Sequence, residues 1–384
     1  MRILIITYGF FPGKKYGGPP VSIYNMTNLI GTHQFYIVAR NHDLGEKKPY
    51  NNVSEGWNRD GNRHTMYLTN SDYKGSVFTK IMGKIKPDLI YLQSLFQSST
   101  APCLYLAWKR NIPVLLAPRG ELLPGAMRKK WKKVPYIFVL RILGLFKNAF
   151  YQATSQDEAE AIVQWLGVRK ERIFQLPNVP VVIEDDYNNE QRIPKIKGVA
   201  KLVFLSRIVV KKNLLFALEV LKEVKSKVSL DVYGPIEDEA YWAKCKEMIS
   251  TLPPNISVKH KGVIEHRLVV ETLRKYDAFL FPTFSENYGH VIIEALSASC
   301  LAIISDQTPW NDLFSYGAGW VLSLSNPKKF TQAIEEVAGL NEDEMSKRRR
   351  GIRAYVQNKL DIPNLRLAYQ NTFSVVAGEN HNKE

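Results

Sequence analysis

The chain has 384 residues, more than one ordinary domain contains, so its length predicts two or three domains. Hydrophobic residues make up 45% and charged residues 23%, which excludes a disordered chain and a scaffold dependent on disulfides. The three cysteines, Cys103, Cys245 and Cys300, lie far apart and offer no metal-ligand spacing. With no signal-peptide pattern and no uncharged apolar run of about 18 residues, we expect a cytoplasmic protein with reduced thiols.

The net charge of +15 admits three classes of partner: nucleic acid, an anionic membrane surface, or anionic small substrates. No helix-turn-helix, RNP or zinc-finger spacing supports nucleic acid. One basic segment immediately precedes the apolar run YIFVLRILGLF (136–146), and its residues are Arg128, Lys129, Lys130, Trp131, Lys132 and Lys133. Cations beside apolar residues predict an element that lies on the inner face of the cell membrane. The alternative is a buried helix after a solvated basic loop.

Apolar, β-branched runs alternate with helix-like segments in both halves of the chain. The expected strands span 2–8, 34–39, 88–93, 113–117, 149–154 and 173–176, then 201–206, 229–233, 257–260, 278–282 and 301–305. The expected helices span 20–31, 73–85, 98–110, 124–147 and 155–167, then 212–226, 238–251, 266–276, 289–298, 328–339 and 362–377. This alternation predicts two doubly wound α/β domains, 1–180 and 195–359, with ligands at the carboxyl ends of their strands. The polar stretch from Val179 to Ile196 is the expected linker, and Asn41 to Arg63 is expected to be a long loop.

The segment SENYGHVIIEAL (285–296) follows an apolar strand and carries two glutamates. Glu286 would stand at the mouth of a strand-to-helix turn, and Glu294 would follow within the helix. A helix that begins near Gly289 directs its free amides and its positive dipole end toward an anion or a sugar oxygen. In isolation, such a pair is more simply a capping glutamate and a salt-bridged one.

Two further segments place suitable groups at strand ends. In LSRIVVKKN (205–213), Arg207 ends a strand and Lys212 precedes a helix, so both cations suit a diphosphate, although surface ion pairing is the simpler alternative. In FFPGKKYGGPP (10–20), Gly17 and Gly18 would allow close approach of the backbone to a ligand, or simply form a tight turn. Neither a GxGxxG pattern nor a P-loop occurs.

Together these segments resemble the family four glycosyltransferases of the retaining GT-B class, which have two Rossmann-like domains facing across a cleft. The family's two glutamates with seven residues between match PTFSENYGHVIIEAL (282–296), and its paired Arg and Lys match Arg207 and Lys212. PDLIYLQS (87–94), ATSQDEAEAI (153–162) and LPNVP (176–180) resemble further landmarks. LAPRGELLPGAM (116–127) is similar to a segment of bacterial members that build surface polysaccharides.

The resemblance implies a donor site in the second domain and an acceptor site in the first, with a terminal helix in 360–384 packing back on the first. Glu286 would hold the donor sugar, supported by the amides of Asn287, Tyr288 and Gly289. Glu294 would bind the ribose, and Gly262 and Val263 would lie near the base. Arg207 and Lys212 would hold the diphosphate, which Gly18 would approach when the domains close.

Several positions depart from the family pattern. Arg119 stands where many members carry a histidine near the sugar, which makes it the candidate on the acceptor side. Tyr233–Gly234–Pro235 lacks the common G-x-G form, and SDQTPW (305–310) replaces a glycine-rich version. No Asp-x-Asp pair occurs among the fourteen aspartates, so we expect neither a metal nor another cofactor.

The implied activity is retaining transfer of a sugar from a nucleotide-sugar, a UDP-sugar before a GDP-sugar, to a lipid-linked or saccharide acceptor. The implied pathway is the synthesis of bacterial surface polysaccharide, such as lipopolysaccharide, O-antigen or capsule. Two alternatives stay open: a nucleotide-sugar epimerase of the same fold, and a membrane-binding module without catalytic activity.

Overall fold

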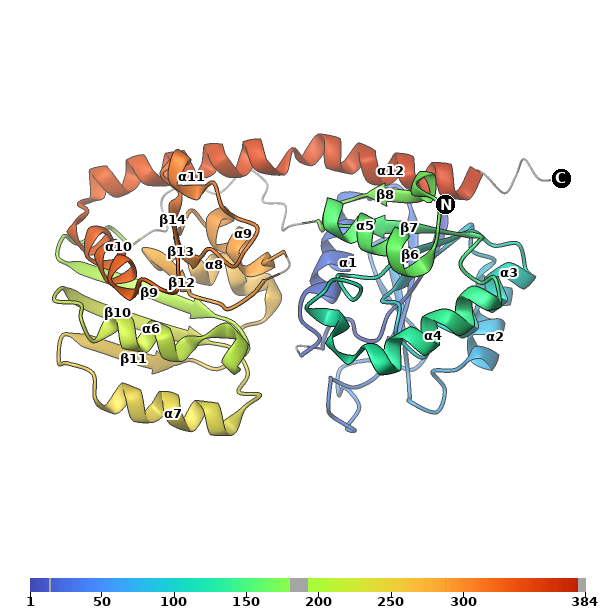
Figure 1. Ribbon diagram of the computed structural model, residues 1–384, viewed down its shortest axis with the longest axis horizontal. Coiled ribbons are helices and arrows are strands. Elements are labelled where there is room, and N and C mark those ends of the chain that lie inside the picture. The colour runs from blue at the N-terminus through green and yellow to red at the C-terminus, as the bar shows by residue number, and fades with distance from the viewer. Residues whose placement is uncertain (14, 180–192, 287, 379–384) are drawn as a thin grey trace. The chain divides into compact units, whose positions relative to one another are not determined.

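The computed structural model describes residues 1–13, 15–179, 193–286 and 288–378, except the side chains of residues 128–130 and 267. The chain divides into two compact units, a first unit of Met1–Val179 with Ile362–Glu384 and a second unit of Pro180–Asp361. Each described unit contains a sheet of mainly parallel strands flanked by helices, as Figure 1 shows. The predicted α/β class with two doubly wound domains is therefore confirmed.

The sheet of the first unit has the strand order β3-β4-β2-β1-β5-β6-β7-β8. Its strands are β1 (Arg2–Ile6), β2 (Gln34–Arg40), β3 (Trp57–Asp60), β4 (Arg63–Leu68), β5 (Leu89–Gln93), β6 (Val114–Ala117), β7 (Ala149–Ala153) and β8 (Ile173–Gln175). Its helices are α1 (Gly18–Leu29), α2 (Gly75–Ile85), α3 (Thr100–Lys109), α4 (Lys130–Ile142), α5 (Gln156–Leu166) and α12 (Ile362–Gly378).

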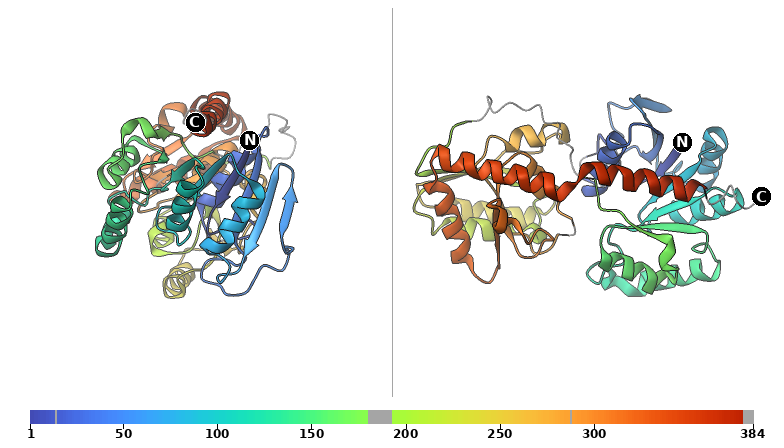
Figure 2. Two further views of the ribbon diagram at one scale, coloured as in Figure 1. Left: turned by 90° about the vertical axis from the view of Figure 1, so that its right-hand side faces the viewer. Right: turned by 90° about the horizontal axis from the view of Figure 1, so that it is seen from above.

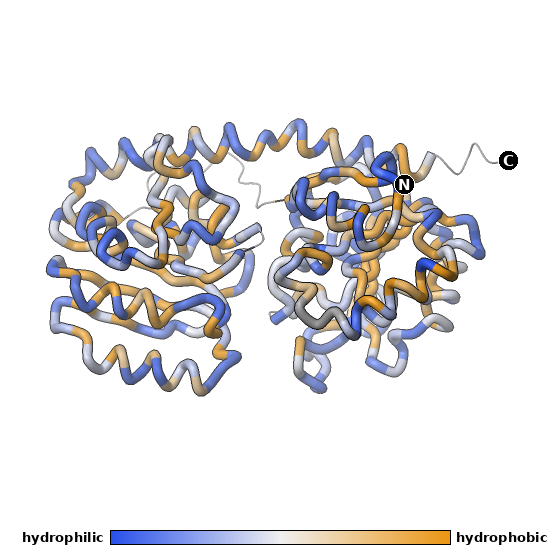
Figure 3. Tube along the Cα trace, viewed as in Figure 1, coloured by the Kyte–Doolittle hydropathy of each residue, from blue (hydrophilic) through white to orange (hydrophobic). Residues whose placement is uncertain are grey.

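Alternate residues of the first-unit strands enter different cores, because successive side chains of a strand point to opposite faces. Ile3 and Ile5 of β1 pack with residues of α1 and α12, whereas Leu4 and Ile6 pack with residues of α2, α3, α4 and α5. In the right-hand view of Figure 2, α12 (red) runs across the first unit, and its Tyr369 donates a hydrogen bond to Pro177 O at 2.9 Å. The continuous apolar runs of the strands, orange in Figure 3, are thus buried on both faces.

The sheet of the second unit has the order β11-β10-β9-β12-β13-β14, with all of its pairs parallel. Its strands are β9 (Val199–Leu205), β10 (Lys227–Tyr233), β11 (Ile256–His260), β12 (Ala278–Phe281), β13 (Leu301–Ser305) and β14 (Gly319–Leu322). Its helices are α6 (Leu214–Leu221), α7 (Glu239–Ser250), α8 (Val269–Leu273), α9 (His290–Ser297), α10 (Pro327–Gly339) and α11 (Glu342–Leu360).

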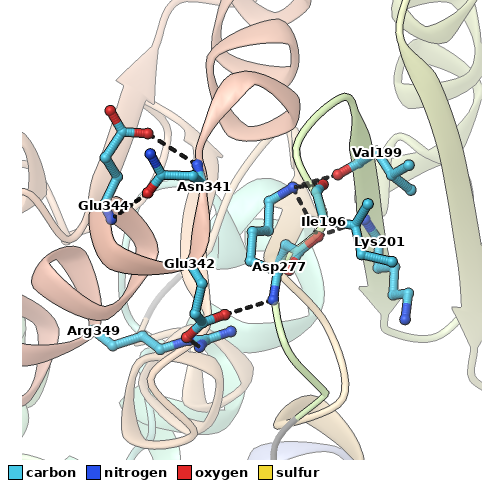
Figure 4. A network of polar contacts seen from close by, with 9 residues as sticks. Ile196, Val199, Lys201, Asp277, Asn341, Glu342, Glu344 and Arg349 are labelled. Carbon is cyan, nitrogen blue, oxygen red and sulfur yellow. Dashed lines mark hydrogen bonds and ion pairs between the residues drawn. The ribbon is translucent and has the colours of Figure 1, made fainter.

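A polar network fixes the start of the second unit at the amino ends of β9 and β12 (Figure 4). The buried ammonium of Lys195 lies 3.7 Å from the Asp277 carboxylate, which accepts a 2.9 Å hydrogen bond from the amide of Lys201. The amide of Lys195 donates to Glu342, in the first turn of α11, and Arg349 pairs with Glu342 at 3.0 Å. The chain entering the sheet is therefore tied to the helix that leaves this unit.

Some sequence predictions of the elements were wrong. The expected loop from Asn41 to Arg63 contains β3 and the first residue of β4, which pair as an antiparallel hairpin around Gly61. The sequence does not predict β3 because polar residues occur on both of its faces. The edge of a sheet tolerates such a polar strand. The helix expected over 124–147 is a 3₁₀ turn, Ala126–Lys129, followed by the shorter α4. Residues 180–192 of the expected linker lie outside the described chain.

Gly234 is required where β10 ends. Its φ is 135°, and a Cβ atom there would lie 1.8 Å from the carbonyl oxygen of Ser206. We expect Gly234→Ala to lower the free energy of unfolding by about 2 kcal/mol or more, because the neighbouring strand end must move. The matched control is Gly339→Ala at the end of α10, where the added Cβ meets no atom within 4 Å. Equal unfolding midpoints for the two variants in urea would contradict this role.

Candidate functional site

The second unit has a topological switch point between β9 and β12. The chain leaves β9 toward β10 on one side and returns to β12 on the other, as the strand order shows. In parallel α/β sheets, ligands bind outside the carboxyl ends of the two strands at such a point. Arg207 and Lys212 follow β9, and Glu286 follows β12, so the sheet brings these predicted residues to one edge.

Lys212 and Glu286 form an ion pair at this edge. Only 10% of the Lys212 side chain and 18% of the Glu286 side chain are exposed. The Lys212 ammonium also lies 5.3 Å from the centre of the Phe281 ring. Burial lowers the pKa of Lys212, while the carboxylate of Glu286 opposes that effect. The pair therefore places a poorly hydrated cation and anion where a ligand could exchange for either partner.

Backbone hydrogen bonds hold the loops that carry this ion pair. The amide of Phe284 donates to Lys211 O at 3.0 Å, which joins the loop after β12 to the loop after β9. The amide of Glu286 donates to Gln307 O at 3.0 Å, which joins the same loop to the end of β13. Both charged side chains therefore project from an anchored backbone.

Arg207 stands beside this ion pair and has a different partner. Its guanidinium pairs with Glu237, from the loop after β10, at 2.9 Å. About two-fifths of its side chain is exposed, 39%, so it can turn toward a ligand. Its charge lowers the pKa of Lys212 further, after the larger effect of burial. Two cations are therefore available at the edge of the sheet, as the sequence predicts.

The turn before α9 has the predicted geometry. Gly289 is the N-cap of α9 with φ 76°, and a Cβ atom there would lie 2.8 Å from Ile292 Cδ1 and 3.1 Å from Glu286 Cγ. None of the described side chains caps these first amides. Trp310 donates its indole N–H to Tyr288 O at 2.6 Å, which fixes the residue before the cap. Asn287 lies outside the described residues.

Glu294 occupies a different environment in the second turn of α9. It is 6% exposed, and burial raises its pKa to about 8. His266 lies 3.6 Å away through Nδ1, and burial lowers the pKa of this histidine to about 4. At neutral pH the two side chains are therefore mostly uncharged and form a polar pair rather than an ion pair.

Gly262 and Val263 precede His266 at the end of β11. Gly262 has φ 76°, and a Cβ there would meet no atom within 4 Å, so its backbone faces open space. Val263 is exposed. The carbonyl of Gly262 accepts a 2.8 Å hydrogen bond from the amide of Gly234, which aligns the ends of β10 and β11.

Arg119 belongs to the first unit and occupies the carboxyl edge of its sheet. Its guanidinium donates to Gln93 Oε1 at 2.6 and 2.8 Å, to Tyr91 Oη at 3.3 Å, and to Asn178. It also lies 3.4 Å from Ser22 Oγ in α1. All these partners are neutral, so its positive charge is uncompensated by any ion pair among the described residues.

The predicted glycine turn lies at the start of α1. Gly17 is the N-cap, with φ 72°, and Gly18 is the first residue of the helix. Among the residues that the structure describes, no side chain caps this end of α1. The positive φ accounts for glycine at position 17, where a side chain would be strained.

Four residues that contact the candidate site residues were not predicted from the sequence. Glu237 pairs with Arg207, and His266 lies beside Glu294. The ring of Phe281 lies beside the ammonium of Lys212, and Trp310 donates a hydrogen bond to Tyr288 O. Glu237 and His266 both follow strand ends, so the rule for doubly wound sheets could have selected them. The contacts of Phe281 and Trp310 depend on tertiary packing and leave no local signal.

The predicted basic segment is partly described. The side chains of Arg128, Lys129 and Lys130 lie outside the described part of the structure. Trp131 and Lys132 are exposed, whereas the Lys133 ammonium donates to Glu121 O at 3.1 Å and to Ala126 O at 3.0 Å. None of the described helices is both long and apolar enough for a membrane span. Within the same residues no three His, Cys, Asp or Glu side chains gather as metal ligands.

Comparison with known proteins identifies the second unit. Its residues 185–356 match the family model described as "Glycosyl transferases group 1". The second unit carries a group 1 glycosyltransferase domain. No curated protein sequence matches the chain.

Solved structures similar to the chain share its fold over nearly all of its length. One is HepE of Anabaena in complex with UDP and glucose, with a TM-score of 0.71, 15% identity, and coverage of 98% of this chain and 100% of that one. Another is WaaG, a glycosyltransferase involved in lipopolysaccharide biosynthesis, with a TM-score of 0.64, 11% identity, and coverage of 98% and 100%. A glycosyltransferase from Rickettsia africae has a TM-score of 0.66, 14% identity, and coverage of 98% of both chains. These likenesses confirm the predicted GT-B fold.

The pairing of Glu294 with His266 predicts how the stability of the glycosyltransferase domain depends on pH. From about pH 6.5, the ordinary pKa of histidine, to about pH 8, the folded chain keeps the Glu294 proton that the unfolded chain has lost. The free energy of unfolding should therefore fall as the pH rises through this window, by up to about 2 kcal/mol. Below pH 6.5, protonation of His266 in the unfolded state has the opposite sign.

The variant Glu294→Gln cannot lose this proton, so its stability relative to the unsubstituted protein should increase between pH 6.5 and 8. Thermal melts of both proteins across this window measure the effect. A difference in midpoint that is independent of pH would show that Glu294 ionises normally.

Proposed function

We propose that the chain is a retaining, metal-independent glycosyltransferase that moves a sugar from a nucleotide-sugar, a UDP-sugar in preference to a GDP-sugar, to a lipid-linked or saccharide acceptor. The observation that carries the proposal is the buried Lys212–Glu286 ion pair at the switch point of a group 1 glycosyltransferase domain. This arrangement combines a cation for a diphosphate with a carboxylate for sugar hydroxyls.

In the proposed reaction, the donor diphosphate binds Lys212 and Arg207, while the donor sugar binds Glu286. The negative charge on the departing nucleotide grows in the transition state, so a positioned and poorly hydrated ammonium stabilises it more than water would. The first amides of α9, which no described side chain caps, add a positive dipole end on the same edge. Glu294 accepts a hydrogen bond from the ribose or donates one to it, and His266 is its neighbour.

The proposed charge stabilisation comes from Lys212 and Arg207, so the reaction would need no divalent cation. Retention would follow from attack of the acceptor on the same face of the sugar from which the nucleotide leaves, with the leaving phosphate taking the acceptor proton. The preference for uridine is supported by HepE of Anabaena, whose fold is similar and whose structures hold UDP and UDP-glucose.

The proposed acceptor side includes Arg119, whose charge has only neutral partners among the described residues. An anionic group of a lipid carrier would complement that charge. WaaG, a structural neighbour, is involved in lipopolysaccharide biosynthesis, which supports a place for this chain in surface-polysaccharide synthesis. A protein acting on such a carrier would work at the inner face of the cell membrane.

We expect Lys212→Met and Glu286→Gln each to lower turnover at least about 100-fold, the loss found for comparable electrostatic groups. Turnover is measured as release of the nucleotide from UDP-sugars in EDTA, with an extract of bacterial lipids or with oligosaccharides as acceptor. Lys212→Met and Glu286→Gln keep the side-chain volume, so thermal melts should report a folded protein in each case.

The matched control is Arg348→Ala, which breaks the ion pair with Glu336, 2.6 Å long, elsewhere in the second unit. Its turnover should stay near that of the unsubstituted chain. Near-normal turnover in Lys212→Met or Glu286→Gln would refute the role of that residue. Conversion of the donor sugar without any acceptor would instead favour the nucleotide-sugar epimerase, and an inverted anomer in the product would refute retention.

A further inference from the structure

Helix α4 buries one face and exposes the other, and both faces are apolar. Ile137 and Leu140 are buried in the core of the first unit. Trp131, Phe138 and Ile142 are 72%, 61% and 69% exposed, and Val134 is also exposed. Residues 131, 134, 138 and 142 are three or four positions apart, so they lie on one face of the helix. Figure 3 shows the hydrophobic residues recurring along α4.

Other large apolar side chains are exposed on α4, just after it, and on α3. Val139 and Leu143 are exposed beside the same stripe, and Tyr105 and Trp108 are exposed on α3. A pocket lined by Trp108 and Leu145 joins α3 to the segment after α4. We call Trp131, Val134, Phe138, Val139, Ile142 and Leu143 the α4 face. A row of large, exposed apolar side chains of this kind on a folded protein marks a site of interaction.

The charge of the surrounding sequence is entirely positive. Between Glu121 and Asp157 the chain has seven Arg and Lys residues and no acidic residue. Lys132 and Arg141 are exposed on opposite sides of the stripe on α4, and Lys147 is exposed just beyond it. Exposed apolar side chains bordered by cations are the pattern of a helix that lies in the headgroup region of a bilayer.

We propose that the α4 face docks the first unit on an anionic lipid bilayer, with α4 parallel to the surface. Trp131, Phe138 and Ile142 enter the boundary between headgroups and acyl chains. Lys132, Arg141 and Lys147 then meet the anionic headgroups at the rim. This proposal goes beyond the proposed transfer reaction, because binding to lipid is measured without donor or acceptor.

The positive charge around the α4 face favours an anionic bilayer over a second copy of the chain as its partner. A symmetric contact through the α4 face would bring two identical basic segments together. With no acidic residue in either segment, like charges would repel across that contact. An anionic bilayer supplies the opposite charge over the whole face.

The experiment measures flotation of the full chain with vesicles of phosphatidylglycerol and phosphatidylcholine, and with vesicles of phosphatidylcholine alone. The chain should bind the anionic vesicles preferentially. The triple variant Trp131→Ser, Phe138→Ser, Ile142→Ser should lower the partition coefficient at least about tenfold, because these side chains no longer enter the bilayer. Lys132→Ala with Lys147→Ala should lower it about fivefold per lysine at low salt.

Matched controls change similar residues elsewhere. Phe314, Leu367 and Val375 are exposed apolar residues outside the α4 face, and Lys244 and Lys246 are exposed lysines of α7. Substitution of these residues by Ser and Ala, respectively, should leave flotation unchanged.

Flotation that the triple variant retains in full would overturn the proposal. So would a concentration-dependent dimer in light scattering that the triple variant abolishes, because the α4 face would then bind a second copy. With a soluble acceptor, release of the nucleotide from the donor should be unaffected in the triple variant, which keeps failure of this proposal separate from failure of the transferase assignment.

Discussion

The site depends on one ion pair, in which a lysine and a glutamate are held together at the edge of an apolar sheet. Removing both charges from water is costly, and their mutual attraction offsets that cost only when both are held in place. The parallel pairing of β9 with β12 brings their loops side by side, and the hydrogen bonds of Phe284 and Glu286 fix the loop backbone. The continuous apolar strands beneath these loops therefore serve the site as well as the core.

Two glutamates of one sequence motif acquire different chemistry from their surroundings. Glu286 faces the ammonium of Lys212, so it has a cationic partner within the protein. Glu294, eight residues later, is buried against a histidine whose own pKa is depressed, and burial raises the pKa of Glu294 to about 8. Glu286 is thus suited to exchange its ion-pair partner for a ligand. Glu294 is suited to share a proton with hydroxyl groups.

Sequence periodicity predicts most of the strands and helices because both sheets are buried on two faces, which makes the strands continuously apolar. It fails where burial is partial. Helix α11 was missed because it buries few residues, among them Met345, Ile352 and Tyr355, and its exposed surface is highly charged. The strands β3 and β14 are short, and β3 lies at the edge of its sheet.

The site shows a similar division. Arg207, Lys212, Glu286 and Gly289 could be predicted because each follows a strand end or opens a helix, and those positions are visible in sequence. Their neighbours Phe281 and Trp310 could not be predicted, since their contacts are set by packing. The exposed stripe on α4 could not be separated from a buried helix by sequence, because apolar residues occur on both faces and only the tertiary structure decides which are covered.

We propose that the second unit binds a nucleotide-sugar without metal at the Lys212–Glu286 edge. The most direct measurement is the thermal stability of the chain in EDTA against UDP, GDP, ADP, CMP and their sugar conjugates. A ligand that binds only the folded chain stabilises it by about 2.7 kcal/mol at a hundredfold excess over its Kd. We expect this stabilisation with the uridine compounds, whereas a stability unchanged by every nucleotide in the panel would rule out a nucleotide site of this kind.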